Sequence, residues 1–193
     1  MTRALFIVDV QNDFTEGGAL GVAGGDAVAA GITAHLAAHA GEYDLIVASR
    51  DWHDPDSDNG GHIALEGTPD FVDTWPVHCI AGTEGAAYDP ELDTSAVTAE
   101  VKKGQGKPAY SLFEGTTEEG KTVAELLAEH AVTDVDVTGI ATDYCVRASA
   151  LDAVAAGLQV RVLTDLIAGV APESSEAALA ELAAAGADVE ASA

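Results

Sequence analysis

Cys145 is the first side chain of this sequence whose position suggests catalysis. The apolar segment 135–140 predicts a buried strand, and Thr142 or Asp143 can cap a helix that continues to Gly157. Cys145 then lies in the first turn of that helix, where unpaired backbone N–H groups favour the thiolate over the thiol. A small cysteine buried in the core is the alternative, and the strand–turn–helix junction gives the two interpretations roughly equal weight.

A nucleophilic thiol needs a base or a cation nearby, and two other segments supply such groups. Asp9 stands at the end of the strand predicted at 4–10 and could accept the thiol proton. Lys103 follows the strand predicted at 97–101 and could stabilise both the thiolate and the Asp9 carboxylate. A loop cap for Asp9 and a surface charge for Lys103 are the alternatives. Lys102 competes with Lys103, because the alternation of a strand points only one of the two inward.

A carboxylate and several imidazoles form a second group of candidate residues. Asp51 and His53 are two residues apart, so both side chains face the same way in an extended segment. His62 and His78 follow in the same loop. One carboxylate with two or three imidazoles suits one divalent Zn, Fe or Mn ion. Polar loop residues that bind no metal are the alternative, and Cys79 is either a further ligand or a core residue.

Strand and helix patterns alternate from one end of the chain to the other. We expect strands at 4–10, 45–49, 97–101, 135–140, 158–163 and 187–190, and helices at 26–40, 118–130, 142–157 and 174–185. Asp26 can cap the first of these helices. This order predicts a three-layer α/β fold, in which a mostly parallel central sheet carries helices on both faces. The length of 193 residues fits a single domain, and the loop from about 51 to 95 is long enough to be functional.

The carboxyl ends of parallel strands are where ligands of such sheets bind. The reactive side chains expected at that edge are Asp9, Asp51, His53, Lys103 and Cys145. An acid, an acid–imidazole pair, an amine and a thiol therefore converge on one place. This convergence is the main argument from the residues for an enzyme.

The composition limits the partners of the chain. Asp and Glu number 33 against 8 Lys and Arg, a net charge of -25, so we expect neither nucleic acid nor an anionic membrane as a partner. Two cysteines make no disulfide framework, and no apolar run approaches the length of a membrane span. The first residues predict a core strand rather than a signal peptide, so we expect a cytoplasmic protein. Whether the chain forms a homo-oligomer stays open.

Six short segments together resemble a known enzyme family. They are 7–14, 51–53, 75–79, 103–104, 109–111 and 139–146. In this order they resemble the isochorismatase-like cysteine hydrolases, and within these the nicotinamidases that also act on pyrazinamide. The resemblance covers nearly the whole chain and implies the isochorismatase-like hydrolase fold. The implied reaction is hydrolysis of nicotinamide to nicotinate and ammonia through a cysteine thioester, a step of NAD salvage.

The resemblance also implies a role for each candidate residue. The catalytic triad would be Asp9, Lys103 and Cys145. A cis peptide bond would join Ile140 to Ala141, and the N–H groups of Ala141 and Cys145 would form an oxyanion hole.

The same resemblance implies a metal site and a substrate pocket. The metal ligands would be Asp51, His53, His62 and His78, with Asp58 or a water as the alternative to His62. The residues of the substrate pocket would be Phe14, Trp75, Tyr110, Ile140, Ala141 and Tyr144.

Three other functions are weighed against this one. A metal-free amidase or isochorismatase-type hydrolase of the same family would not need the set of Asp51, His53 and His78. A non-enzymatic protein that binds a metal or a small molecule would not need Cys145 together with its base and cation. A hydrolase in which a metal-activated water attacks the substrate would make Cys145 a bystander.

Overall fold

The computed structural model describes residues 2–192, and within them the strands form one parallel sheet. The strand order is β3-β2-β1-β4-β5-β6. The strands are β1 (Arg3–Val8), β2 (Leu45–Asp51), β3 (Ala99–Lys103), β4 (Asp134–Ile140), β5 (Gln159–Ala168) and β6 (Asp188–Glu190). The helices are α1 (Gly25–His39), α2 (Val123–Glu129), α3 (Arg147–Ala155) and α4 (Pro172–Ala185), with short helical turns η1 (Ala40–Glu42), η2 (Leu112–Glu114) and η3 (Thr142–Val146).

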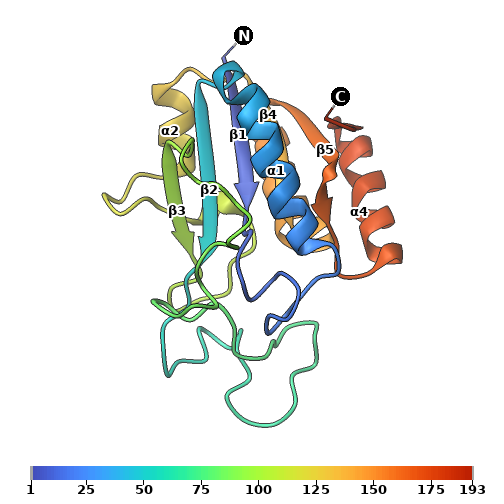
Figure 1. Cartoon of the computed structure of the whole chain (residues 1–193). Helices are drawn as coiled ribbons and strands as arrows, with labels where there is room; N and C mark the ends of the chain where they lie inside the picture. The colour runs from blue at the N-terminus through green and yellow to red at the C-terminus, as the bar shows by residue number, and fades with distance from the viewer. Residues whose placement is uncertain (1, 193) are drawn as a thin grey trace.

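Side-chain alternation along the strands builds two cores, one on each face of the sheet. On β1, Phe6 and Val8 belong to the core beneath α2, α3 and α4, whereas Leu5 and Ile7 belong to the core beneath α1. Figure 1 shows α1 lying across one face of the sheet. The prediction of three layers with a parallel sheet and helices on both faces is therefore confirmed.

Two strands extend further toward the site than the sequence predicts. β2 includes Asp51, and β3 includes Lys103, because these residues still pair with each other in the parallel ladder. By contrast, the helix expected from 118 begins only at Val123. Thr122 and Glu125 form a reciprocal capping box there, and this local hydrogen bonding fixes the start of the helix.

Two of the expected helix caps are wrong. α1 has Gly24 as its cap in the left-handed conformation, and Asp26 instead accepts a hydrogen bond from the Glu16 amide. After β4 the chain enters the π-helical turn η3 without a side-chain cap. The carboxylate of Asp143 points away from that turn and accepts hydrogen bonds from the amides of Val170 and Ala171, just before α4.

The loop that connects β2 to β3 lies beyond the carboxyl ends of the strands, as Figure 1 shows. In the part of the chain that the structure describes, residues 52–98 form isolated bridges only, among them His53 with Ile80 and Ile63 with Trp75. The sheet order reverses between β1 and β4, which is where a ligand crevice forms in such sheets. Among residues 2–192, no helix is long and apolar enough to cross a membrane.

Candidate active site

Lys103 is the centre of the arrangement at the carboxyl ends of the strands. Its Nζ lies 2.8 Å from Asp9 Oδ2 and 3.8 Å from Cys145 Sγ, and it donates a short hydrogen bond to Asp51 Oδ1. Asp9 follows β1, Asp51 ends β2, Lys103 ends β3, and Cys145 lies in η3 after β4. All four side chains are buried. Four segments far apart in the sequence thus bring two carboxylates, an ammonium and a thiol together.

The buried charges set the proton affinities of this group. Burial opposes the charge of Lys103, but Asp51 and Asp9 outweigh it and raise the pKa of Lys103 well above its ordinary value. Burial also disfavours the Asp51 carboxylate, but Lys103 and the neighbouring histidines hold its pKa well below its usual range. For Asp9, burial outweighs the attraction of Lys103 and raises the pKa. Asp9 is therefore the better proton acceptor of the two carboxylates.

The thiol of Cys145 is protonated in this environment. Burial raises its pKa well above the ordinary value, and Lys103 offsets only part of that effect. A nucleophilic role for this thiol would require a base, and the Asp9 carboxyl is a near neighbour of the thiol. The sequence predicts that the N–H groups of the first helical turn favour the thiolate of Cys145. In the structure, the effect of burial is larger, and the position in η3 does not by itself produce a thiolate.

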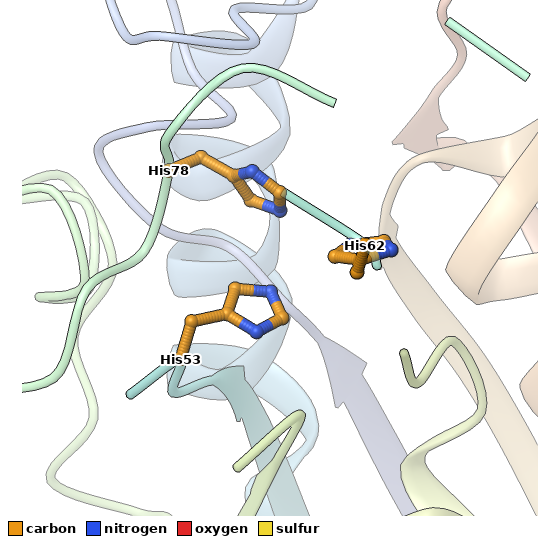
Figure 2. A group of neighbouring side chains, drawn as sticks. All are labelled: His53, His62 and His78. Atoms are coloured by element: carbon orange, nitrogen blue, oxygen red, sulfur yellow. The ribbon is translucent and has the colours of Figure 1, made fainter. Parts of the chain in front are cut away.

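His53, His62 and His78 form a group beside Asp51, and their ligand nitrogens lie within 4.8 Å of one another. Figure 2 shows the three imidazole rings converging from separate stretches of the chain. Asp51 Oδ2 lies 3.7 Å from His53 Nε2 and 3.8 Å from His78 Nε2. The carboxylate of Asp51 therefore connects the group around Lys103 to the three imidazoles. One of its oxygens faces Lys103, and the other faces the imidazoles.

The hydrogen bonds of the histidines leave their inner nitrogens free for a metal. Nδ1 of His53 bonds to the Gly104 carbonyl at 2.8 Å, and Nδ1 of His78 bonds to the Pro76 carbonyl at 2.7 Å. Both rings then carry the proton on Nδ1 and present the lone pair of Nε2 to the centre. His53 Nε2 and His62 Nδ1 are buried without a hydrogen-bond partner among residues 2–192.

The protonation state of the histidines also suits a metal. Burial first, and then His53 and His78, lower the pKa of His62 to about 4, so its ring is neutral at pH 7. Neutral imidazoles with a carboxylate are a donor set for Zn, Fe or Mn. The residues present therefore fit one divalent ion.

The backbone beside His53 requires a glycine at position 104. Its φ is +84, a conformation that L side chains rarely adopt, and an added Cβ would lie 2.6 Å from Cε1 of His53. Only glycine lets the backbone pass close enough for its carbonyl to hold the His53 ring.

A cavity of about 540 Å³ joins the imidazole group to Cys145. Its walls include every residue expected in the substrate pocket: Phe14, Trp75, Tyr110, Ile140, Ala141 and Tyr144. Trp75 donates a hydrogen bond of 3.1 Å to the Tyr110 hydroxyl and packs edge-on against Tyr144 at 5.2 Å. The peptide bond between Ile140 and Ala141 is cis, as expected. The cavity suits a flat aromatic ring held between a thiol and a metal site.

The structure separates the sequence candidates from their competitors. Lys102 points away from the site, with Nζ 4.5 Å from the Trp52 ring and 3.6 Å from Glu100. Cys79 is buried outside the imidazole group, and its amide donates to Asp13. The carboxylate of Asp58 accepts a hydrogen bond from the Gly60 amide instead of joining the group.

Several residues around the site are absent from the sequence-based candidates. Gln11 clamps the backbone of Asp51: its Nε2 donates to the Asp51 carbonyl at 2.9 Å, and its Oε1 accepts from the Asp51 amide at 2.8 Å. Phe71 and Val170 line the cavity and are exposed to solvent. Ser49 contacts Asp9 directly. A polar residue just beyond the end of an apolar strand, such as Gln11, is a signal in the sequence for such a position.

Comparison with known proteins places the chain among characterised enzymes. An isochorismatase domain model matches residues 3–193. The chain is 51% identical over 180 residues to the nicotinamidase/pyrazinamidase of Mycobacterium tuberculosis, covering 93% of this chain and 94% of that protein. It is 36% identical to the nicotinamidase of Escherichia coli, covering 96% and 92%.

Two solved structures are similar over nearly the whole chain. PnC1 from L. infantum in complex with nicotinate has a TM-score of 0.84 and 34% identity, covering 99% of this chain and 93% of that one. The pyrazinamidase of Pyrococcus horikoshii in complex with zinc has a TM-score of 0.81 and 36% identity, covering 98% of each chain.

Proposed function

This chain belongs to the isochorismatase family, and on that premise we propose that it hydrolyses nicotinamide to nicotinate and ammonia, and pyrazinamide to pyrazinoate. The observation that carries the proposal is the position of buried Lys103, in contact with Asp9, Asp51 and Cys145 beside an aromatic cavity. The names of the relatives supply the substrate class. Nicotinamidase activity would return nicotinamide to NAD synthesis, and two free cysteines suit a reducing cytoplasm.

The first half of the proposed reaction forms a thioester. Asp9 accepts the proton of Cys145, and the thiolate attacks the carboxamide carbon. The N–H groups of Ala141 and Cys145 bind the oxyanion. Asp9 then gives its proton to the departing ammonia, and Lys103 balances the negative charges throughout. The raised pKa of Asp9 supports this role, because a carboxyl that binds protons more tightly can accept one from a thiol.

The second half hydrolyses the thioester. Asp9 takes a proton from a water molecule, which attacks the acyl carbon. The carbon–sulfur bond breaks, and the Asp9 proton returns to Cys145. Nicotinate leaves and the starting state is restored, so the net reaction consumes one water and releases one ammonia.

Substrate position depends on the remaining residues. Phe14, Trp75, Tyr110 and Tyr144 would enclose the ring. Asp51, His53, His62 and His78 would hold one divalent Zn, Fe or Mn ion. When bound, this ion would act as a Lewis acid toward a ring nitrogen of the substrate. In this proposal Cys145 is the nucleophile, and activation of the attacking water is left to Asp9.

An ammonia-release assay tests the proposal. Purified protein should release ammonia from nicotinamide and from pyrazinamide, and a chelator should suppress the release until a divalent metal is restored. Cys145→Ala should abolish ammonia release, and the control Cys79→Ala should retain it. Activity that survives in Cys145→Ala would favour a metal-activated water as the attacking group. No release from either amide under any metal supplement would indicate another amidase or isochorismatase-type activity.

A further inference from the structure

Ser49 is a fully buried hydroxyl residue that touches the proposed base. Its Oγ donates a hydrogen bond of 2.7 Å to Asp9 Oδ1 and accepts one of 3.3 Å from the Asp9 amide. Asp9 has a φ of 48, in the left-handed region that residues other than glycine rarely occupy. Ser49 therefore holds both the side chain and the backbone of a residue in an unfavourable conformation.

The two oxygens of the Asp9 carboxylate face different groups. Ser49 occupies Oδ1, whereas Oδ2 lies 2.8 Å from Lys103 Nζ. Oδ2 makes no well-oriented hydrogen bond within residues 2–192, although it forms that ion pair. Oδ2 is therefore the oxygen that faces Lys103, whose Nζ also lies 3.8 Å from Cys145 Sγ.

Building on the proposed function, we infer that Ser49 is a positioning residue that reserves Asp9 Oδ2 for the proton exchanged with Cys145. A protonated carboxyl keeps its other oxygen as an acceptor, so the bond from Ser49 to Oδ1 persists in both states of Asp9. A proton on Oδ1 would oppose the hydroxyl proton of Ser49. Rotation of the carboxyl group would lose the same bond.

The location of Ser49 in the sheet explains why it can do this. Ser49 and Asp51 lie two residues apart on β2 and face the same side of the sheet. In the ladder, Ser49 is opposite Val101 and Asp51 is opposite Lys103. Ser49 therefore follows Leu45 and Val47 on the apolar face of β2. A hydroxyl at a fully buried position of that face needs a polar partner, and Asp9 is the partner.

A purely structural role predicts a different result, so the experiment compares three variants. Ser49→Ala removes the hydroxyl, Ser49→Thr keeps it, and Thr138→Val removes another buried strand hydroxyl that bonds to the Phe6 carbonyl at 2.8 Å. We expect Ser49→Ala to lower kcat for nicotinamide by roughly 10- to 100-fold, with KM and metal content unchanged. Ser49→Thr should restore most of kcat, and Thr138→Val should keep both kinetic constants.

A second measurement needs no amide substrate. Iodoacetamide alkylates the thiolate of Cys145, which is accessible from the cavity, and mass spectrometry identifies the modified residue. Ser49→Ala should be alkylated more slowly than wild type, and Ser49→Thr at nearly the wild-type rate. This order supports the inference even if the substrate is not nicotinamide, and wild-type protein that releases no ammonia would refute only the proposed function.

Two results overturn the inference. The first is Ser49→Ala with the wild-type kcat and the wild-type alkylation rate. The second is Ser49→Thr that is as slow as Ser49→Ala in both measurements while its thermal unfolding matches wild type, because the hydroxyl would then be irrelevant.

Discussion

Two groups of polar side chains lie against the same sheet but use their polar atoms differently. The strand-end cluster consists of Asp9, Asp51, His53, His62, His78, Lys103 and Cys145. The helix-side cluster links α1 to β4 and β5 and consists of His35, Tyr43, Asp136 and Arg161. Within residues 2–192, the strand-end cluster contains three buried atoms without a hydrogen-bond partner, which are Asp9 Oδ2, His53 Nε2 and His62 Nδ1.

The polar atoms of the helix-side cluster bond mainly to one another, and Arg161 also contacts Glu190 at 3.5 Å. Arg161 donates two hydrogen bonds to the Asp136 carboxylate, at 2.9 and 2.7 Å. The Tyr43 hydroxyl donates to Asp136 at 2.7 Å and accepts from His35 Nε2 at 2.8 Å. In the described chain none of these four side chains has an unpaired buried polar atom.

This difference distinguishes a ligand-binding site from a network that stabilises the fold. A buried polar group without a partner is costly, and a fold keeps several of them together where a ligand or a reacting proton supplies the missing contact. A closed network supplies its own contacts and stabilises the packing of a helix on a sheet. The strand-end cluster should therefore respond to metals and substrates, and the helix-side cluster should affect stability alone.

Removing the central cation should produce the largest effect. Lys103→Met leaves the carboxylates of Asp9 and Asp51 buried next to each other without a counter-charge. We expect ammonia release to fall at least about 100-fold, and the free energy of unfolding to fall by about 3–5 kcal/mol. Enzyme kinetics and urea unfolding measure the two effects. The control Lys102→Met, on the outward side of β3, should retain activity. Wild-type kinetics in Lys103→Met would contradict the assignment.

Metal binding should distinguish the clusters next. Zn²⁺ at about 100 times its Kd should raise the free energy of unfolding of the wild-type protein by about 2.7 kcal/mol, because the ion binds the folded state. His62→Ala should lose most of this response in a thermal shift experiment, since one of the clustered imidazoles is gone. His35→Gln, which changes a histidine of the helix-side cluster, should keep the response. An equal shift in all three proteins would mean that the ion binds elsewhere on the acidic surface.

Disrupting the helix-side cluster should lower stability and leave activity unchanged. Asp136→Asn removes the charge that Arg161 and Tyr43 share, and hydrogen bonds to a charged group contribute roughly 1.5–3 kcal/mol. We expect the free energy of unfolding to fall by about 2 kcal/mol, with kcat and KM for nicotinamide unchanged. Urea unfolding and steady-state kinetics on the same preparation check both statements. A loss of kcat without a loss of stability would show that the two clusters are coupled.

The contrast also explains how much the sequence could predict. The sequence predicts that Asp9, Asp51, Lys103 and Cys145 lie together, because each follows an apolar strand and parallel topology brings such ends to one edge. Asp136 and Arg161 were missed because their pairing depends on the register of β4 against β5, where they lie directly opposite each other. The apolar alternation of the two strands limits this register but leaves more than one pairing possible. Ser49 was missed because a single serine near a strand end has no distinctive spacing, and only the position of Asp9 gives it a partner.

Loop conformation was the other part that the sequence could not predict. The convergence of His53, His62 and His78 depends on bridges within residues 52–98, such as the one from Ile63 to Trp75, and no periodic pattern precedes them. The family resemblance, rather than local physics, selected His62 over Asp58.

The smallest expected effect is a pH dependence in the helix-side cluster. Burial first, and then the nearby charge of His39 and Arg161, lower the pKa of His35, while Asp136 and Asp165 work in the opposite direction. The folded protein therefore binds this proton less tightly than the unfolded chain. Its contribution to stability is complete above pH 6.5, the ordinary pKa, and is lost as the pH falls through the lowered value.

The measurement is a difference between two proteins, so that the contributions of all other groups cancel. Between pH 7 and pH 5, wild type should lose more free energy of unfolding than His35→Gln, by less than about 1 kcal/mol. Glutamine keeps a hydrogen-bond donor for Tyr43 but binds no proton. Ammonia release at each pH should be the same in both proteins, since His35 lies outside the cavity. If the two stability curves stay parallel, the closed network tolerates a charged imidazole, and its separation from the strand-end cluster rests on the Asp136 experiment.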